Sequence, residues 1–168
     1  GHGLGKVPKW VLIKNLTDAE DWAVYHASVG NTKYLQLNST AVPATSSAYW
    51  NDTDPTSSLI TLNNSNDVQR INREYIVYAW SEVSGYSKFD SYTGNGSATG
   101  PVVTTGFKVK WLMIKSSTVA GAGWYIWDSE RDTSNPRDKV LRADDSGAEA
   151  SGSGYNINFN DDGFQVVS

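Results

Sequence analysis

The amino-acid sequence predicts an all-β fold, an antiparallel β-sandwich of jelly-roll or concanavalin-like type with an internally duplicated set of strands. Three observations lead to this prediction. The composition is rich in Gly, Ser, Thr, Asn, Trp and Tyr, which suits short strands joined by tight turns and disfavours helices. Turn signals recur roughly every 8–12 residues, as in sandwiches and barrels. Several short segments occur twice, in the same order.

The repeated segments are the most informative feature of the chain. Four of them recur: KWVLIK (9–14) as KWLMIK (110–115), WAVYH (22–26) as WYIWD (124–128), KYLQLNST (33–40) as KVLRADDS (139–146), and SLITL (58–62) as GFQVV (163–167). Four matches in one order predict an internal duplication covering approximately 4–62 and 105–168, linked by unduplicated strands in 63–104.

The duplication predicts which side chains form the core, because a repeat keeps the inward face of each strand. The expected core pairs are Trp10 with Trp111, Ile13 with Ile114, Trp22 with Trp124, Tyr25 with Trp127, Leu35 with Leu141, and Leu59 with Phe164. We expect one domain over 1–168, in which each copy contributes strands to both sheets. Two small independent domains are the alternative, and each would have a thin core.

The remaining strands are predicted from local pattern. YIVYAWSEV at 75–83 is rich in β-branched and aromatic residues and gives the strongest strand signal. GYSKFDSYTGNGS at 85–97 is typical of a strand followed by a Gly/Asn turn. NINFNDDGFQVV at 156–167 predicts a hairpin, with Asp-Gly in the turn.

The sequence gives little support for catalysis by reactive side chains. The chain has no cysteine and two histidines, and no nucleophile motif is present. Its carboxylates lie mostly in predicted turns, so we expect no enzyme and no cofactor. NFNDDG at 158–163 resembles the start of a calcium loop, but the hairpin explains it better, and no metal site is predicted. The turn with Asp52 and Asp54 leaves weak Ca²⁺ binding open.

Charge and hydropathy exclude two classes of partner. The net charge is −4 and the basic residues are scattered, so no nucleic-acid partner is expected. The longest apolar run has about six residues, whereas a membrane-spanning helix needs roughly 20, so no membrane insertion is expected.

A ligand site is predicted where aromatic residues stand in polar company. Tyr49, Trp50, Asn51 and Asp52 lie in SSAYWNDTDP. An exposed ring beside Asn and Asp can bind a sugar through stacking and side-chain hydrogen bonds. In the alternative, Trp50 caps the end of the sandwich and shields the core.

The phrases GHGLGKVPKWVLIKN, DWAVYHASVGNTKYLQLNST, YAWSEVSGYSKFDSYTGNGS and TGFKVKWLMIK resemble a largely uncharacterised domain family of tail-fibre and other virion proteins of marine bacteriophages. The resemblance covers essentially the whole chain. It implies a virion-surface, extracellular location, a homo-oligomer that is often trimeric in fibres, and other virion proteins as partners. In longer members an extra strand precedes the GHGLG segment, so we expect this chain to be an excised C-terminal portion.

Three functions follow as hypotheses. The first is adhesion to host glycans by a tail-fibre or capsid-surface module. The second is a purely structural decoration or assembly module without glycan binding. The third is a polysaccharide-degrading enzyme, which would need two carboxylates facing one groove.

Overall fold

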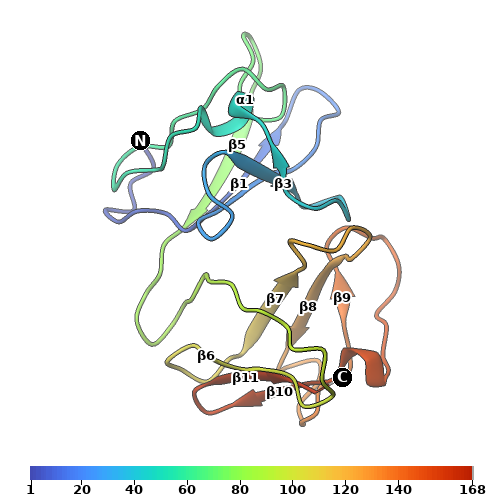
Figure 1. Cartoon of the computed structure of the whole chain (residues 1–168). Coiled ribbons are helices and arrows are strands. Elements are labelled where there is room, and N and C mark those ends of the chain that lie inside the picture. The colour runs from blue at the N-terminus through green and yellow to red at the C-terminus, as the bar shows by residue number, and fades with distance from the viewer. Residues whose placement is uncertain (168) are drawn as a thin grey trace. The chain divides into compact units, whose positions relative to one another are not determined.

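The computed structural model describes residues 1–167, and the regular secondary structure in it is almost entirely antiparallel β-strand (Figure 1). Contacts divide the chain into two compact units. Unit 1 comprises Gly1–Glu82 with Ser116–Ala122, and unit 2 comprises Val83–Lys115 with Gly123–Ser168. The expected all-β antiparallel fold is confirmed, whereas a single folding domain over 1–168 stays a prediction.

Unit 1 is organised around one five-stranded sheet with the order β4-β3-β2-β1-β5. The YIVYAW segment, predicted as the strongest strand, forms β5 and pairs along the whole of β1. A single helical turn, α1, follows β4. The elements are β1 (Trp10–Asn15), β2 (Ala23–His26), β3 (Lys33–Gln36), β4 (Ala44–Thr45), α1 (Ser47–Trp50) and β5 (Tyr75–Trp80).

The core of unit 1 forms on one face of this sheet. Val11 pairs with Tyr25 and Ile13 with Ala23, so these four side chains share a face. Helix α1 adds two aromatic residues to them. The buried members of the core are Val11, Ile13, Ala23, Tyr25, Tyr49, Trp50 and Val68. Burial of each large apolar side chain contributes about 1.5–3 kcal/mol to stability.

Unit 2 contains two three-stranded sheets, with the orders β7-β8-β9 and β10-β11-β6. Its elements are β6 (Val102–Thr104), β7 (Trp111–Lys115), β8 (Trp124–Asp128), β9 (Leu141–Arg142), the 3-10 turn η1 (Ser153–Tyr155), β10 (Ile157–Asn160) and β11 (Gly163–Val166). Its core draws on both sheets, and its buried members are Val109, Trp127, Val140, Ile157, Phe159 and Phe164.

The predicted C-terminal hairpin is confirmed. Strands β10 and β11 pair antiparallel across a two-residue turn at Asp161 and Asp162, and Gly163 is the first residue of β11. Gly163 has φ +155° and pairs with Thr104 of β6. The loop that resembled a calcium motif therefore serves as a hairpin turn.

The two meanders β1-β2-β3 and β7-β8-β9 have the same register at the repeated positions. Trp10 pairs with His26, and Trp111 pairs with Asp128. One strand further on, Val24 pairs with Leu35, and Ile126 pairs with Leu141. Each pair of partners occupies matching places in the two repeats of the sequence. The duplication itself stays a prediction, and these registers support it.

The capping of the second strand also matches between the meanders. Asn38 accepts a hydrogen bond from the Trp22 backbone N–H at 3.0 Å through its side-chain oxygen. Asp144 accepts one from the Trp124 backbone N–H at 2.5 Å in the same way. Asn38 and Asp144 lie at the same position of the repeat, three residues after Leu35 and Leu141.

The distribution of strands among sheets differs from expectation. Within the described residues no sheet combines strands from the two repeats, so the expectation that each copy contributes to both sheets is wrong. The segment 58–62 forms no strand, and its Ile60 and Leu62 pack against the unit 1 core as coil. The segment 85–97 contributes only an isolated bridge between Val83 and Ser87.

Three residues of the expected core are exposed instead. Trp111 is 52% exposed because it lies on β7, a strand at the edge of its sheet. Leu59 is exposed because its segment lacks strand partners, and Leu141 lies on β9, also at an edge. Burial of Ile13, Tyr25, Leu35, Trp124, Trp127 and Phe164 is confirmed.

Candidate functional site

The structure places the predicted aromatic pair, Tyr49 and Trp50, in the core of unit 1. Trp50 is 1% exposed, and its indole N–H donates to the Lys33 carbonyl at 3.0 Å. Its ring lies edge-on to Tyr25, with 5.6 Å between the ring centroids. The expectation that Trp50 presents a face for sugar stacking is therefore wrong. The alternative, that this residue shields the core, agrees with its burial.

The cause is the helical turn α1, which the sequence pattern did not reveal. Ser46 caps the turn by accepting a hydrogen bond from the Ala48 backbone N–H at 3.2 Å. Asn51 ends it in the left-handed conformation, with φ +52°. A turn of helix carries both neighbouring aromatic residues onto the sheet, whereas a strand would point them to opposite faces.

Asn51 and Asp52 are exposed beyond α1, and both have positive φ. The Asn63 side-chain amide donates to the Asn51 side-chain oxygen at 3.1 Å. This bond anchors the turn in unit 1. A ligand-binding role for Asn51 and Asp52 stays a prediction, and it would have to operate without the two rings beside them.

Tyr49 is held by a polar contact inside unit 1. Its hydroxyl donates to the Asp67 carboxylate at 2.5 Å, and its ring stacks on Tyr34 with 3.6 Å between the centroids. Burial and the bond to Asp67 raise the pKa of the Tyr49 hydroxyl. Burial, together with the Asp54 carboxylate, raises the pKa of the Tyr25 hydroxyl to about 12.

These two tyrosines predict alkaline sensitivity. An unfolded tyrosine ionises near pH 10, whereas Tyr25 and Tyr49 keep their protons to higher pH in the folded state. The unfolded state therefore binds fewer protons above pH 10, and the free energy of unfolding should fall as pH rises from about 10 to 12. Each tyrosine contributes up to about 1.4 kcal/mol per pH unit. Urea denaturation at pH 8, 10 and 11.5 measures this loss.

The matched variant for this prediction is Tyr25→Phe, which keeps the ring in the core. In this variant the free energy of unfolding should fall less steeply between pH 10 and 12. A pH profile that is the same with and without the Tyr25 hydroxyl would contradict the assignment.

Unit 2 contains an aromatic-lined pocket of about 210 Å³. Four rings form much of its wall, and they come from the loop before β6, from β8 and from η1. The lining residues are Tyr92, Ile114, Tyr125, Trp127, Gly154, Tyr155, Asn156, Ile157 and Val166. This volume lies below the roughly 300–1,000 Å³ typical of drug-sized ligands, so the pocket suits one small ring or the end group of a chain.

Tyr125 lies at the centre of the ring cluster. Its centroid is 6.0 Å from that of Trp127 and 5.9 Å from that of Tyr155, and both neighbours are tilted. The Trp127 indole N–H donates to the Tyr155 carbonyl at 3.0 Å, which ties β8 to η1. Tyr92 contacts Phe164 edge-on at 5.7 Å. The rings are thus held in place by each other and by the core of unit 2.

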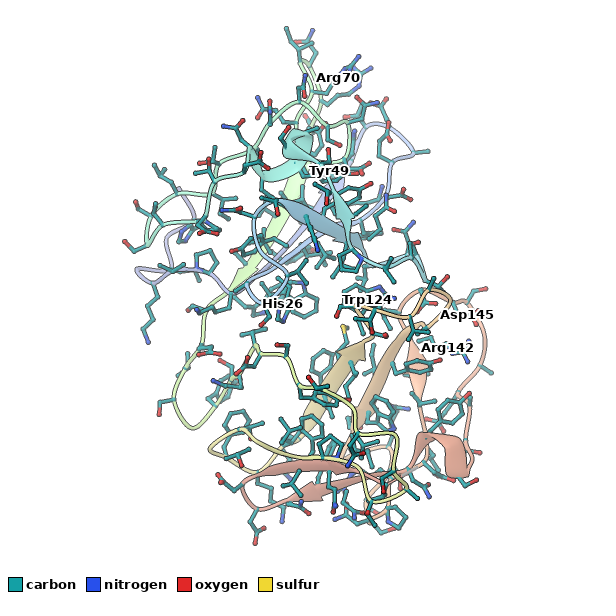
Figure 2. All side chains as sticks on the ribbon, viewed as in Figure 1. His26, Tyr49, Arg70, Trp124, Arg142 and Asp145 are labelled. Carbon is teal, nitrogen blue, oxygen red and sulfur yellow. The ribbon has the colours of Figure 1, made fainter. Side chains whose placement is uncertain are left out.

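Polar groups border the pocket on one side. The Arg142 guanidinium lies 5.2 Å from the Tyr125 ring centroid and donates to the Tyr155 hydroxyl at 3.3 Å. Arg142 also pairs with Asp145 at 3.7 Å, and both side chains are marked in Figure 2. Asn156 lines the wall next to Tyr155. An amide and a phenol can orient the hydroxyl groups of a ligand whose apolar face rests on the rings.

The pocket occupies the place that corresponds to the predicted site in the other repeat. Tyr49 follows Leu35 by 14 residues, and Tyr155 follows Leu141 by 14 residues. By the same spacing α1 corresponds to η1, and Trp50 corresponds to Asn156. Unit 1 thus fills this position with a buried indole, and unit 2 carries a small amide there.

The sequence analysis selected neither Tyr155 nor Asn156 as a site residue, because the loops of the two repeats align too loosely to pair them with Tyr49 and Trp50. The signal that would have found them is the constant spacing from the third repeated strand. A β-bridge in unit 2 supports the alignment, since Val140 bridges Ala150 where Tyr34 pairs with Ala44.

In the part of the chain that the structure describes, no group of three or more His, Cys, Asp or Glu side chains could hold a metal ion. Asp161 lies in the hairpin turn and pairs with Lys108 at 3.1 Å. No helix among the described residues is long and apolar enough to cross a membrane.

Fold and pocket together describe an all-β protein with an aromatic-lined pocket in its second unit. The whole chain, residues 1–168, matches the family described as "Domain of unknown function (DUF7483)", and the protein belongs to this family. No curated protein and no solved structure matches the chain.

Proposed function

We propose that this protein is a carbohydrate-binding module of a virion surface and that it binds host glycans through the aromatic pocket of unit 2. The observation that carries the proposal is the clustering of Tyr92, Tyr125, Trp127 and Tyr155 around one pocket with Asn156 in its wall. Sugar rings present apolar C–H faces and polar edges, and such a wall offers partners for both.

The electrostatics of the chain favour an uncharged sugar over a polyanion. The net charge is −4, which repels anionic polymers at long range. Arg142, the cation beside the pocket, is already paired with Asp145 and bonded to Tyr155. We therefore expect recognition of a neutral terminal or side-branch sugar by stacking and hydrogen bonding.

The virion setting rests on the sequence resemblance to tail-fibre and other virion proteins. The fold is compatible with it, because antiparallel sheets form a stable scaffold whose loops can vary and bind. The pocket favours adhesion over a purely structural role, because a decoration or assembly module would not need a pocket.

The proposal predicts that Asn156→Trp weakens glycan binding. This substitution gives unit 2 the residue that unit 1 has at the corresponding position, and the indole should fill the space between Tyr125 and Tyr155. We expect at least about a tenfold loss of affinity, equivalent to about 1.4 kcal/mol. The measurement is glycan-array screening of the wild type followed by titration calorimetry of each hit with both proteins.

Asn95→Trp is the matched control, since Asn95 is exposed and outside the pocket lining. It should bind as the wild type does. Circular dichroism and thermal unfolding would verify that both variants are folded. A wild-type protein that binds no glycan would refute the proposed function, and a folded Asn156→Trp variant that binds normally would refute this pocket as the site.

A further inference from the structure

The sequence contains one Asn-Gly pair, Asn95-Gly96, which lies in the exposed loop before β6. An asparagine side chain can react with the backbone nitrogen of the next residue, and glycine obstructs this reaction least because it has no Cβ atom. The surroundings are open as well. Beyond its two chain neighbours, no atom lies within 4 Å of the place where a Cβ atom of Gly96 would stand. Water therefore has access to the peptide bond between the two residues.

The side-chain amide of Asn95 is held against its own backbone. Its Oδ1 accepts a hydrogen bond from the Ser97 backbone N–H at 3.1 Å, and its Nδ2 donates to the Thr99 carbonyl at 3.4 Å. The first contact is an Asx turn, in which the side chain bonds to the backbone two residues on. The ring of atoms that this bond closes includes both the Asn95 side-chain carbonyl carbon and the Gly96 nitrogen. The Ser97 N–H also draws electron density from this carbonyl, which favours attack on it.

The Gly96 nitrogen is available for this attack, since within residues 1–167 its N–H donates no hydrogen bond. Asn15 provides a contrast inside the same chain. Its Oδ1 likewise accepts from the Thr17 backbone N–H, at 2.8 Å. The nitrogen that follows it is engaged, however, because the Leu16 N–H donates to the Glu74 carbonyl at 2.8 Å, and Asn15 is only 2% exposed. The fold thus hinders the reaction at Asn15 and leaves it open in the loop before β6.

We propose that Asn95 is a site of spontaneous covalent modification in the folded protein, where deamidation converts it to isoaspartate and aspartate. The Gly96 nitrogen loses its proton to hydroxide and bonds to the Asn95 side-chain carbonyl carbon, and the amide nitrogen leaves as ammonia. Water then opens the resulting succinimide. Cleavage between the Gly96 nitrogen and the side-chain carbon gives aspartate, whereas cleavage between that nitrogen and the main-chain carbon gives isoaspartate.

The reaction changes the loop in two ways. Each product adds one negative charge to a chain whose net charge is −4, and isoaspartate also lengthens the backbone by one carbon. The loop is anchored on both sides of Asn95. The Tyr92 ring packs edge-on against Phe164 at 5.7 Å, and the Gly100 carbonyl accepts from the Gln165 side chain at 3.3 Å. Tyr92 also lines the pocket of unit 2, so the modified and unmodified forms differ in a loop that adjoins this pocket.

The proposal is tested by incubating the folded wild type for several weeks in mildly acidic and mildly alkaline buffer, with peptide mapping by mass spectrometry at every asparagine. Asn95 should deamidate at least about tenfold faster than Asn64, which is exposed but followed by serine. The rate should rise with pH, because the attacking nitrogen must lose its proton. Isoaspartate methyltransferase should label the product, and Asn15 should stay intact.

Asn95→Gln is the matched control, because the longer side chain would have to close a six-membered ring, and it should stay unmodified. The same mapping in urea separates reaction of the folded chain from reaction of opened chains. A rate at Asn95 at least about tenfold lower in the folded protein than in urea would overturn the proposal, because the reaction would then need local unfolding. Equal rates at Asn95 and Asn64, or a rate independent of pH, would also overturn it. None of these readouts depends on a glycan.

Discussion

Replacing Trp50 by alanine should destabilise unit 1 by about 3–5 kcal/mol, the usual range for removing a fully buried tryptophan. The substitution empties the space beneath α1, leaves Tyr25 without its edge-on ring contact, and removes the donor to the Lys33 carbonyl. Native-state hydrogen exchange would locate the loss. Amides of β1 and β2 should lose protection, and amides of β10 and β11 should change less.

Trp111→Ala is the matched control, because it removes the same side chain from a site that is 52% exposed. The Trp111→Ala substitution should change the free energy of unfolding by no more than about 1 kcal/mol. If Trp50→Ala were as stable as the wild type and yet failed to bind glycan, Trp50 would be a binding residue after all, and its burial in unit 1 would have to open in solution.

Replacing Gly163 by alanine should disrupt the pairing of β11 with β6. A Cβ atom at this position would lie 2.0 Å from the Val103 carbonyl oxygen, and the backbone has φ +155°, which a residue with a side chain rarely adopts. Because the obstructing atom belongs to the backbone of the neighbouring strand, it cannot rotate away. We expect a loss of about 2–4 kcal/mol, measured by urea denaturation followed by circular dichroism.

Gly94→Ala provides the comparison for Gly163→Ala. Gly94 has open space around its Cβ position and no positive φ, so alanine there should be close to neutral. Equal stability of the two variants would mean that β6 and β11 separate at little cost, and that the three-stranded sheet contributes little to unit 2.

The sequence predicted the all-β class and several of the strands well, because those features depend on local pattern. KWVLIK and KWLMIK are nearly the same segment and both form strands, β1 and β7, and the residues that pair across each hairpin occupy matching places in the two repeats. The hairpin at 156–167 was equally accessible, since a turn flanked by alternating residues specifies it locally.

The sequence could not predict where each strand edge lies or which residues cover it. Trp111 occupies the same place in KWLMIK as Trp10 in KWVLIK, yet β1 has a strand on both sides, β2 and β5, whereas in the described residues β7 pairs only with β8. Leu59 is as apolar as Phe164, but the segment 58–62 forms no strand. Exposure at these positions depends on distant segments, which hydrophobic alternation does not report.

The aromatic residues of the predicted site, Tyr49 and Trp50, are buried in unit 1, and the proposed pocket lies at the corresponding position of the second repeat. Local polarity around SSAYWNDTDP suggested exposure, whereas the capped turn α1 buries its two aromatic residues. Asn156 was overlooked because an amide in a Ser/Gly loop carries no signal of its own. Asn156 stands out only when it is aligned with Trp50, and that alignment counts residues from the third strand of each repeat.

The membership of Ser116–Ala122 in unit 1 has a genetic consequence. This stretch joins β7 to β8 of unit 2, yet its Gly121 backbone N–H donates to the Thr40 carbonyl at 3.1 Å. The chain therefore passes from one unit to the other after Glu82, after Lys115 and after Ala122. A single crossover between related genes at codon 82 would transfer unit 1 without this stretch, so an intact exchange needs two separate stretches of gene inherited together.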